Sequence, residues 1–208
     1  MAKINTVLFD FDGTIMDTCE VIISSWQHTF MTIEGKERPV SEILKTLGEP
    51  LDFTMRNLYP DFDTEEAVSI YRSYHVENFG ERINLFPGMK ELLATLKEKG
   101  YKIGLVTSRM TGTTMEGLEK YHIKEYFDVV ITADDTKKHK PDPEPVYKAL
   151  EKLGASPEES IMVGDTDYDI LCAKNAGVKS VLVGWALAMP EEAPDHIIEK
   201  AEDLFEIL

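Results

Sequence analysis

The chain has 208 residues, of which 43% are hydrophobic, so it is long enough for one sizeable core and a small second unit. Lys and Arg number 22 against 38 Asp and Glu, and the formal net charge of -16 argues against partners such as nucleic acid or an anionic membrane. Cys19 and Cys172 lack metal-ligand spacing, so neither a disulfide framework nor a structural zinc site is expected. Without a signal-peptide core or an apolar run of about 20 residues, a cytoplasmic location is expected.

Short apolar or β-branched runs alternate with helical patterns along most of the chain. The runs are nearly continuous, as is typical of strands that are covered on both faces. The predicted strands are residues 6–9, 102–106, 129–131, 161–163 and 178–183. Helical periodicity follows in segments such as 89–96 and 146–153, the second of which ends at Gly154. This alternation predicts an α/β fold with a doubly wound, Rossmann-like parallel sheet.

Residues 18–85 interrupt this alternation, with apolar stripes at helical spacing and no convincing strand. One stripe runs from Ile22 through Trp26 to Ile33, and another ends at Gly48. We therefore expect a core domain formed by residues 1–17 and 86–208, with residues 18–85 inserted as a small helical domain. Trp26 is expected to pack inside that domain.

Polar residues gather where the predicted strands end. The first strand runs into Asp10-Phe11-Asp12-Gly13-Thr14, the second into Thr107-Ser108, and the fourth into Gly164-Asp165-Thr166-Asp167-Tyr168-Asp169. Lys140 follows the third strand. Because ligands of an open parallel sheet bind beyond the carboxyl ends of its strands, we expect these side chains to meet at one sheet edge. Several carboxylates brought together there require a cation, and an all-oxygen ligand set favours Mg²⁺ over zinc.

Each of these motifs also has a structural interpretation when it is taken alone. Thr107-Ser108 fits a helix cap, and Lys140-Pro141-Asp142-Pro143 fits a helix entry with Asp142 as N-cap. Asp165 and Asp169 are four residues apart, so on a helical turn they would share a face. The order in which the four motifs follow apolar strands favours a functional site.

With these motifs in this order, the chain resembles the haloacid dehalogenase superfamily of aspartate-nucleophile phosphatases, and the resemblance covers nearly the whole chain. The helical insert is similar to the superfamily's type 1 cap. Within the superfamily, the sequence is most similar to the phosphoglycolate phosphatases and to inorganic pyrophosphatases of the same branch. The segment Lys140-Pro141-Asp142-Pro143-Glu144-Pro145-Val146 particularly resembles the pyrophosphatase group.

The resemblance implies roles for the residues at the strand ends. Asp10 would be the nucleophile, and Asp12 the general acid and base. Mg²⁺ would be held by Asp10, the Asp12 main-chain carbonyl and Asp165, with Asp169 orienting that side through water or Lys140. The phosphoryl oxygens would be bound by Thr107, Lys140 and backbone amides near Gly13 and Ser108. The expected substrate is a small phosphorylated compound, and the expected assembly is a monomer or a homodimer.

Substrate choice would then lie in the helical insert. Arg56 is the best candidate there to bind a substrate carboxylate or distal phosphate, with a surface arginine as the alternative, and His28 is a weaker candidate. Asp12 argues against a dehalogenase, which needs no acid at this position. A phosphonate hydrolase of this superfamily would need a cap lysine, and Lys36 and Lys45 sit among polar neighbours.

Two alternative functions remain open at this point. A β-phosphoglucomutase-type enzyme of the same superfamily would pass the phosphoryl group from Asp10 to a sugar hydroxyl instead of to water. A non-catalytic phosphate-binding protein would keep the fold without turnover. The intact set of Asp10, Asp12, Lys140 and Asp165 argues against this second alternative.

Overall fold

The structure is a computed structural model that describes residues 3–187 and 189–208. The chain divides into two compact units, one formed by Met1–Asp17 and Leu85–Leu208 and the other by Thr18–Asn84. The observed division differs from the expected one at a single residue, Leu85, which lies with the first unit. Within the described ranges, no helix is long and apolar enough to cross a membrane.

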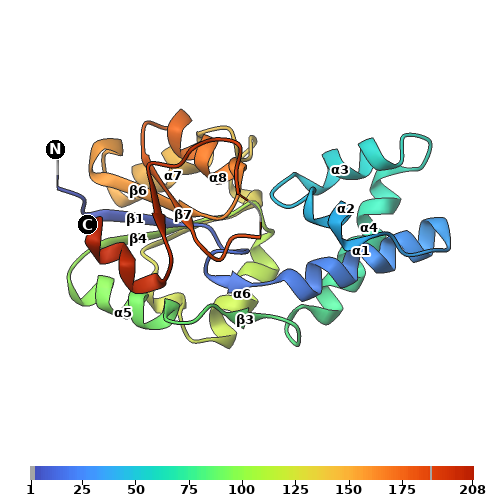
Figure 1. Cartoon of the computed structure of the whole chain (residues 1–208), viewed down its shortest axis with the longest axis horizontal. Helices are drawn as coiled ribbons and strands as arrows, with labels where there is room; N and C mark the ends of the chain where they lie inside the picture. The colour runs from blue at the N-terminus through green and yellow to red at the C-terminus, as the bar shows by residue number, and fades with distance from the viewer. Residues whose placement is uncertain (1–2, 188) are drawn as a thin grey trace. The chain divides into compact units, whose positions relative to one another are not determined.

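The first unit is built on a six-stranded sheet with the order β5-β4-β1-β6-β7-β8, in which every pair is parallel (Figure 1). The strands are β1 Thr6–Phe9, β4 Lys102–Val106, β5 Val129–Ile131, β6 Ser160–Gly164, β7 Lys179–Val183 and β8 His196–Ile198. All four residues of β1 are buried, as their unbroken apolar run predicts. The doubly wound α/β fold predicted from the sequence is confirmed.

The central position of β1 decides where the site lies. Phe9, its last residue, is in register with Leu105 of β4 on one side and with Val163 of β6 on the other. The segments that follow these three strands therefore leave the sheet at the same edge and begin side by side.

Helices cover both faces of this sheet. They are α5 Met89–Glu98, α6 Thr111–Lys120, α7 Glu144–Leu153 and α8 Asp167–Asn175, with short 3-10 turns η1 Lys124–Tyr126, η2 Ala133–Asp135, η3 Pro157–Glu159 and η4 Ala201–Glu206. Figure 1 shows α7 and α8 on one side of the strands and α5 on the other. One core cluster joins Leu8 and Met162 of the sheet to Leu150 of α7 and Ala173 of α8. Burial of such side chains is the main stabilising term for the unit.

Three short strands were missed by the sequence analysis. β8 has only three residues, one of them His196, and only Ile198 is fully buried, so it carries no apolar run. β2 (Met16–Asp17) and β3 (Asn84–Leu85) pair in a separate two-stranded sheet and have two residues each. Hydrophobic periodicity cannot detect segments this short.

Two helix starts differ from the interpretations considered above. α6 begins at Thr111 with Met110 as N-cap, so Thr107-Ser108 does not cap a helix. α7 has Pro143 as its N-cap rather than Asp142, although Asp142 Oδ1 still accepts a 3.0 Å hydrogen bond from the Glu144 amide. The peptide bond between Lys140 and Pro141 is cis.

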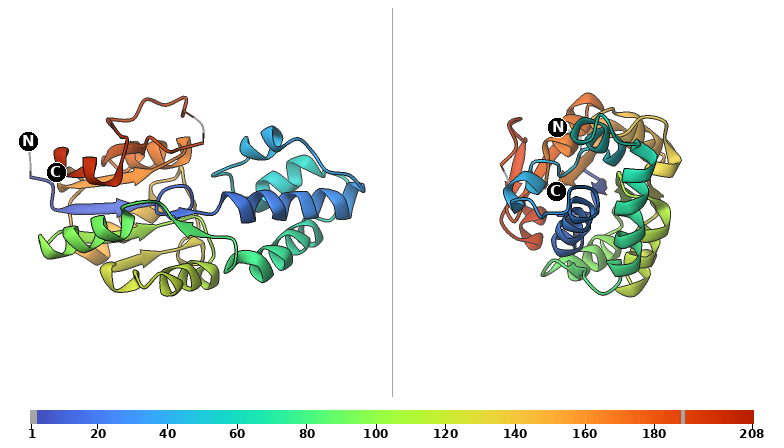
Figure 2. Two further views of the ribbon diagram at one scale, coloured as in Figure 1. Left: turned by 60° about the horizontal axis from the view of Figure 1, so that its bottom comes forward. Right: turned by 90° about the vertical axis from the view of Figure 1, so that its right-hand side faces the viewer.

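The second unit consists of four helices, α1 Cys19–Glu34, α2 Val40–Leu44, α3 Leu51–Leu58 and α4 Thr64–Phe79, which Figure 2 shows in two orientations. Its core contains Trp26 of α1, which stacks on Phe30 at 5.6 Å between ring centroids and meets Tyr71 of α4 edge-on at 5.2 Å. Trp26 is thus a packing residue, as expected. Lys36 and Lys45 are both exposed, as their polar neighbours predict.

Candidate active site

Asp10 and Lys140 form a buried ion pair at the carboxyl end of β1. Asp10 is the residue directly after the strand, and the two residues are 7% and 4% exposed. Lys140 Nζ donates hydrogen bonds of 2.6 Å to Asp10 Oδ1 and of 2.6 Å to Asp169 Oδ1. Lys140 therefore connects the loop before α7 to the carboxyl end of β1 and to the first turn of α8.

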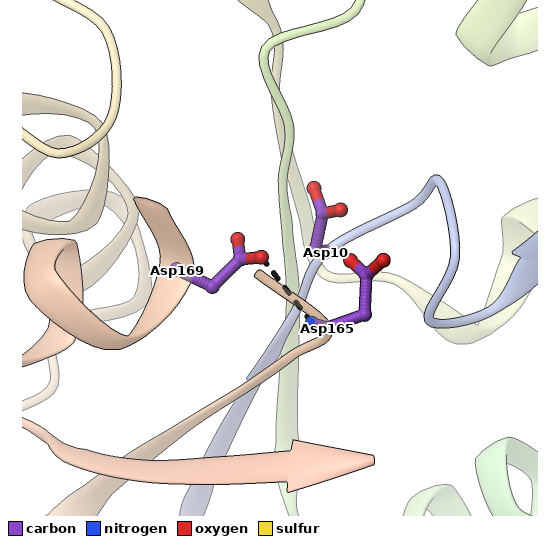
Figure 3. A group of neighbouring side chains, drawn as sticks. All are labelled: Asp10, Asp165 and Asp169. Atoms are coloured by element: carbon purple, nitrogen blue, oxygen red, sulfur yellow. Dashed lines mark hydrogen bonds between the residues drawn. The ribbon is translucent and has the colours of Figure 1, made fainter. Parts of the chain in front are cut away.

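Asp169 lies in the first turn of α8 and uses both of its carboxylate oxygens. Oδ1 accepts from Lys140, while Oδ2 accepts from the Thr166 hydroxyl at 2.8 Å, the Thr166 amide at 3.1 Å and the Asp165 amide at 3.3 Å. Figure 3 shows the last of these bonds between Asp165 and Asp169. Asp165 precedes the N-cap Thr166, so the two aspartates do not share a helix face. Their proximity comes instead from the capping of α8.

Asp10, Asp165 and Asp169 form one carboxylate cluster, and all three side chains are buried. One oxygen from each lies within 4.8 Å of the others (Figure 3). The Thr14 hydroxyl also donates to Asp165 Oδ1 at 3.5 Å. Three buried carboxylates share only one lysine, an arrangement that favours binding of a cation, and the donors are all oxygens. This set fits Mg²⁺. Asp10 and Asp165 would be its direct ligands, because both oxygens of Asp169 accept hydrogen bonds, whereas Asp10 and Asp165 are each described with a hydrogen bond to one oxygen.

Burial and charge shift the titration of this cluster. Burial raises the pKa of Asp10 to about 7; the Asp169 and Asp12 carboxylates add to the rise, and Lys140 opposes it. Burial, followed by the charge of Asp169, also holds the pKa of Asp165 well above its usual range. For Lys140, burial alone would lower the pKa, but Asp10 and Asp169 outweigh burial and raise it. Lys140 is therefore a permanent cation, whereas Asp10 and Asp165 need further positive charge to ionise fully.

Asp12, the second aspartate of the first motif, is held by an arginine rather than by Lys140. Arg109 donates from Nη2 to Asp12 Oδ1 at 2.7 Å and from Nε to Oδ2 at 3.0 Å. The Asp12 charge is also among those that raise the pKa of Asp10 and Asp165.

Gly13 allows the tight turn that follows Asp10 and that packs against the Asp165 side chain. Its φ is +71°, and a Cβ placed on it would lie 2.0 Å from Asp165 Oδ2, so only glycine fits. Its own amide donates to the Met16 carbonyl at 2.9 Å. The Gly13 amide is therefore used inside the turn, and phosphate binding by amides near Gly13 stays a prediction.

Thr107 and Ser108 follow β4 at the same sheet edge. Thr107 is 4% exposed, and its hydroxyl accepts a 3.2 Å hydrogen bond from the Arg109 amide. Ser108 is exposed.

Asp167, the remaining acid of the fourth motif, accepts hydrogen bonds from the amides of Glu191 and Glu192 and takes no part in the carboxylate cluster.

The two candidates for substrate recognition, Arg56 and His28, lie in the helical unit. Arg56 is on α3 with 65% of its side chain exposed, 3.8 Å from Asp52. His28 is exposed on α1 and stacks on Tyr74 of α4, with 4.5 Å between ring centroids. His28 is thus a surface residue, and Arg56 keeps an exposed guanidinium.

Sequence reasoning missed two residues of this region, Arg109 and Trp185. Arg109 follows Ser108 after β4, and Trp185 follows Gly184 after β7. Their positions just beyond strand ends were the signal that could have pointed to them. The Trp185 indole donates to the Thr14 carbonyl at 3.3 Å and its ring packs on Phe86. Trp185 thereby supports the turn that follows Asp10.

Comparison with known proteins gives consistent matches. A family model described as haloacid dehalogenase-like hydrolase matches residues 7–183. Pyrophosphatase PpaX of Halalkalibacterium halodurans and that of Bacillus cereus strain AH820 are each 40% identical over 210 residues, covering 99% of this chain and 97% of the relative.

Solved structures agree with this match over the whole chain. A provisionally named phosphoglycolate phosphatase from Lactobacillus plantarum superposes with a TM-score of 0.89 at 26% identity, covering 100% of both chains. A haloacid dehalogenase-like family protein from Streptococcus pneumoniae gives 0.85 at 26% identity, covering 100% of this chain and 99% of its own. The resemblance read from the motifs is confirmed: the chain belongs to the haloacid dehalogenase-like hydrolase family.

Proposed function

We propose that the chain is a Mg²⁺-dependent phosphohydrolase that attacks a small phosphoryl compound with Asp10 and then hydrolyses the aspartyl-phosphate. The observation that carries this proposal is the buried cluster in which Lys140 contacts Asp10 and Asp169 at 2.6 Å while Asp165 lies alongside. This cluster supports a carboxylate nucleophile, a fixed cation and an oxygen-only metal site at one sheet edge.

In the first step, a carboxylate oxygen of Asp10 forms a bond to phosphorus as the bond from phosphorus to the leaving oxygen breaks. Lys140 and Thr107 bind the phosphoryl oxygens, on which charge is spread in the transition state. Asp12 gives its proton to the leaving oxygen. When bound, Mg²⁺ supplies the positive charge that lets Asp10 ionise and that offsets the phosphoryl charge.

In the second step, water attacks the phosphorus of the aspartyl-phosphate. Asp12, now ionised, takes a proton from that water, the bond between Asp10 and phosphorus breaks, and inorganic phosphate leaves. One carboxylate thus acts first as acid and then as base, which requires it to lie beside Asp10. The effect of the Asp12 charge on Asp10 supports this placement.

For the substrate, we propose pyrophosphate, because the relatives at 40% identity are named pyrophosphatases. The core residues bind a phosphoryl group and leave the rest of the substrate unspecified. We therefore propose that the helical unit works as a cap that selects the substrate, with Arg56 as a cation for a distal phosphate.

An activity panel tests the substrate. Phosphate release is measured with Mg²⁺ and with EDTA on pyrophosphate, phosphoglycolate, hexose phosphates and nucleotides. We expect metal-dependent release with the highest kcat/KM for pyrophosphate. A preference for phosphoglycolate would overturn the substrate and keep the mechanism, whereas transfer of label between hexose phosphate positions without phosphate release would select the mutase.

The nucleophile is tested by Asp10→Asn. We expect a loss of kcat of at least about 10³-fold, because the variant cannot form the covalent intermediate. Asp167→Asn is the matched control, since Asp167 accepts hydrogen bonds outside the cluster, and it should keep near wild-type turnover. Wild-type turnover in Asp10→Asn would exclude the proposed nucleophile. An inactive wild-type chain on every substrate would support the non-catalytic alternative.

A further inference from the structure

The guanidinium of Arg109 is largely buried and is fixed by several contacts. Its side chain is 7% exposed, whereas that of its partner Asp12 is 28% exposed. Nε and Nη2 donate to both oxygens of Asp12, and Nη1 donates to the Thr113 hydroxyl at 3.2 Å. The guanidinium carbon lies 5.6 Å from the centre of the Phe11 ring.

This geometry decides the orientation of the Asp12 carboxylate. A bidentate pair between a guanidinium and a carboxylate keeps the two groups coplanar, so it fixes a torsion that would otherwise rotate freely. Arg109 is itself held by three contacts: its Nη1 donates to the Thr113 hydroxyl, its guanidinium lies over the Phe11 ring, and its backbone amide donates to the Thr107 hydroxyl. The orientation of Asp12 is thus set by the segment that follows β4.

We propose that Arg109 is a positioning residue that orients Asp12 for its proton transfers to the leaving oxygen and from the attacking water. This inference rests on the role of Asp12 in the proposed function. Proton transfer requires hydrogen-bond reach and alignment, and a misplacement of about 1 Å costs roughly 10²-fold in rate. Since Arg109 directs its Nε and Nη2 at Asp12, its effect is exerted through that carboxylate.

The test compares Arg109→Met, Arg109→Lys, Asp12→Asn and the double variant Asp12→Asn/Arg109→Met on the best substrate of the panel. We expect Arg109→Met to lose about 10²-fold in kcat with little change in KM. The kcat of Arg109→Lys should lie between those of Arg109→Met and wild type, because lysine keeps the positive charge but lacks the planar guanidinium. The double variant should be no slower than Asp12→Asn alone, since residues acting as one unit are not additive.

A second readout is the dependence of rate on the leaving group, measured with a series of aryl phosphates from 4-nitrophenyl to phenyl phosphate. Loss of an oriented acid slows poor leaving groups most, so the rate should fall more steeply along the series in Arg109→Met and Asp12→Asn than in wild type. A purely structural role of Arg109 would lower stability and leave this slope unchanged, which would overturn the proposal.

Controls separate the possible failures. Arg38→Met removes an arginine with a comparable 2.7 Å ion pair to Glu34 in the helical unit, and it should lower the melting temperature while keeping kcat. If Arg109→Met does not fold, Thr113→Val removes the Nη1 partner together with a 3.4 Å hydrogen bond to the Met110 carbonyl. It should lower kcat several-fold, again without effect in the Asp12→Asn background. A raised KM at unchanged kcat, or losses that add to those of Asp12→Asn, would overturn the proposal. Full activity of Asp12→Asn would instead overturn the role of Asp12 itself.

Discussion

As the proposed nucleophile, Asp10 must meet two requirements that oppose each other, because a nucleophile has to be ionised and a buried carboxylate resists ionisation. Burial raises its pKa to about 7, and Lys140 at 2.6 Å offsets only part of that rise. The same burial excludes bulk water from the reacting atoms, which strengthens every charge interaction there. In the metal-free chain, ionisation of the buried Asp10 carboxylate therefore lowers the stability of the fold.

The pH dependence of stability follows from the sign of this shift. The folded chain keeps the Asp10 proton up to a pKa of about 7, whereas the unfolded chain loses it near 3.8. The contribution to stability is therefore complete below pH 4 and is lost as the pH rises through 7. In EDTA, we expect the melting temperature of wild type to fall between pH 5 and 8 by a few °C more than that of Asp10→Asn. Equal slopes in the two proteins would contradict this.

At the scale of elements, the first turn of α8 carries two aspartates, one buried in the site and one partly exposed beside a loop. Asp169 is buried, accepts from the Thr166 amide and hydroxyl, and binds Lys140. Asp167 is partly exposed and accepts from the amides of Glu191 and Glu192. One side chain thus couples the helix to the site, while the other couples it to a loop.

These two aspartates give a matched pair of variants. Asp169→Ala and Asp167→Ala each remove backbone hydrogen bonds at a helix start or loop, so each should cost about 1 kcal/mol of unfolding free energy. Only Asp169→Ala should also lower kcat, by roughly 10- to 100-fold, because Asp169 orients Lys140 and the segment that carries Asp165. Urea unfolding and steady-state kinetics measure both effects. A comparable loss of kcat in Asp167→Ala would show that the effect is not specific to the site.

At the scale of the whole molecule, strand order creates the acidic site that the charged groups alone would disfavour. β1 lies between β4 and β6, so Asp10, Thr107 and Asp165 leave the sheet side by side. With a formal net charge of -16, the chain has no general attraction for phosphate, and the proposed phosphate binding would depend on the local arrangement of Lys140, Thr107 and metal.

Metal binding should therefore stabilise the folded chain. A ligand that binds only the folded state adds about 2.7 kcal/mol at 100 times its Kd, so saturating Mg²⁺ should raise the melting temperature of wild type by roughly 5 °C or more at pH 8. Asp165→Asn removes a proposed direct ligand and should lose most of this gain, and Asp167→Asn should keep it. Differential scanning fluorimetry with and without Mg²⁺ measures the shift, and an unchanged wild-type melting temperature would refute the site.

The sequence by itself determined the fold class and the identity of the chemical groups. Continuous apolar runs that alternate with helical periodicity predict a parallel sheet, and the motif residues after those runs predict a site at its carboxyl edge. Both predictions depend on local patterns, which is why they could be made without coordinates. The segments shorter than this pattern, such as β8 and the two-residue strands, could not be found.

The tertiary structure decided which groups meet. Lys140 pairs with Asp10 across 130 positions of the chain, and Arg109 pairs with Asp12 across 97, and no local pattern encodes either contact. The tertiary structure also decided that both carboxylate oxygens of Asp169 accept hydrogen bonds, and that the Gly13 amide donates within a turn. The physical reason is that pairing of charges and burial depend on strand order and loop geometry, which are properties of the packed chain rather than of any segment.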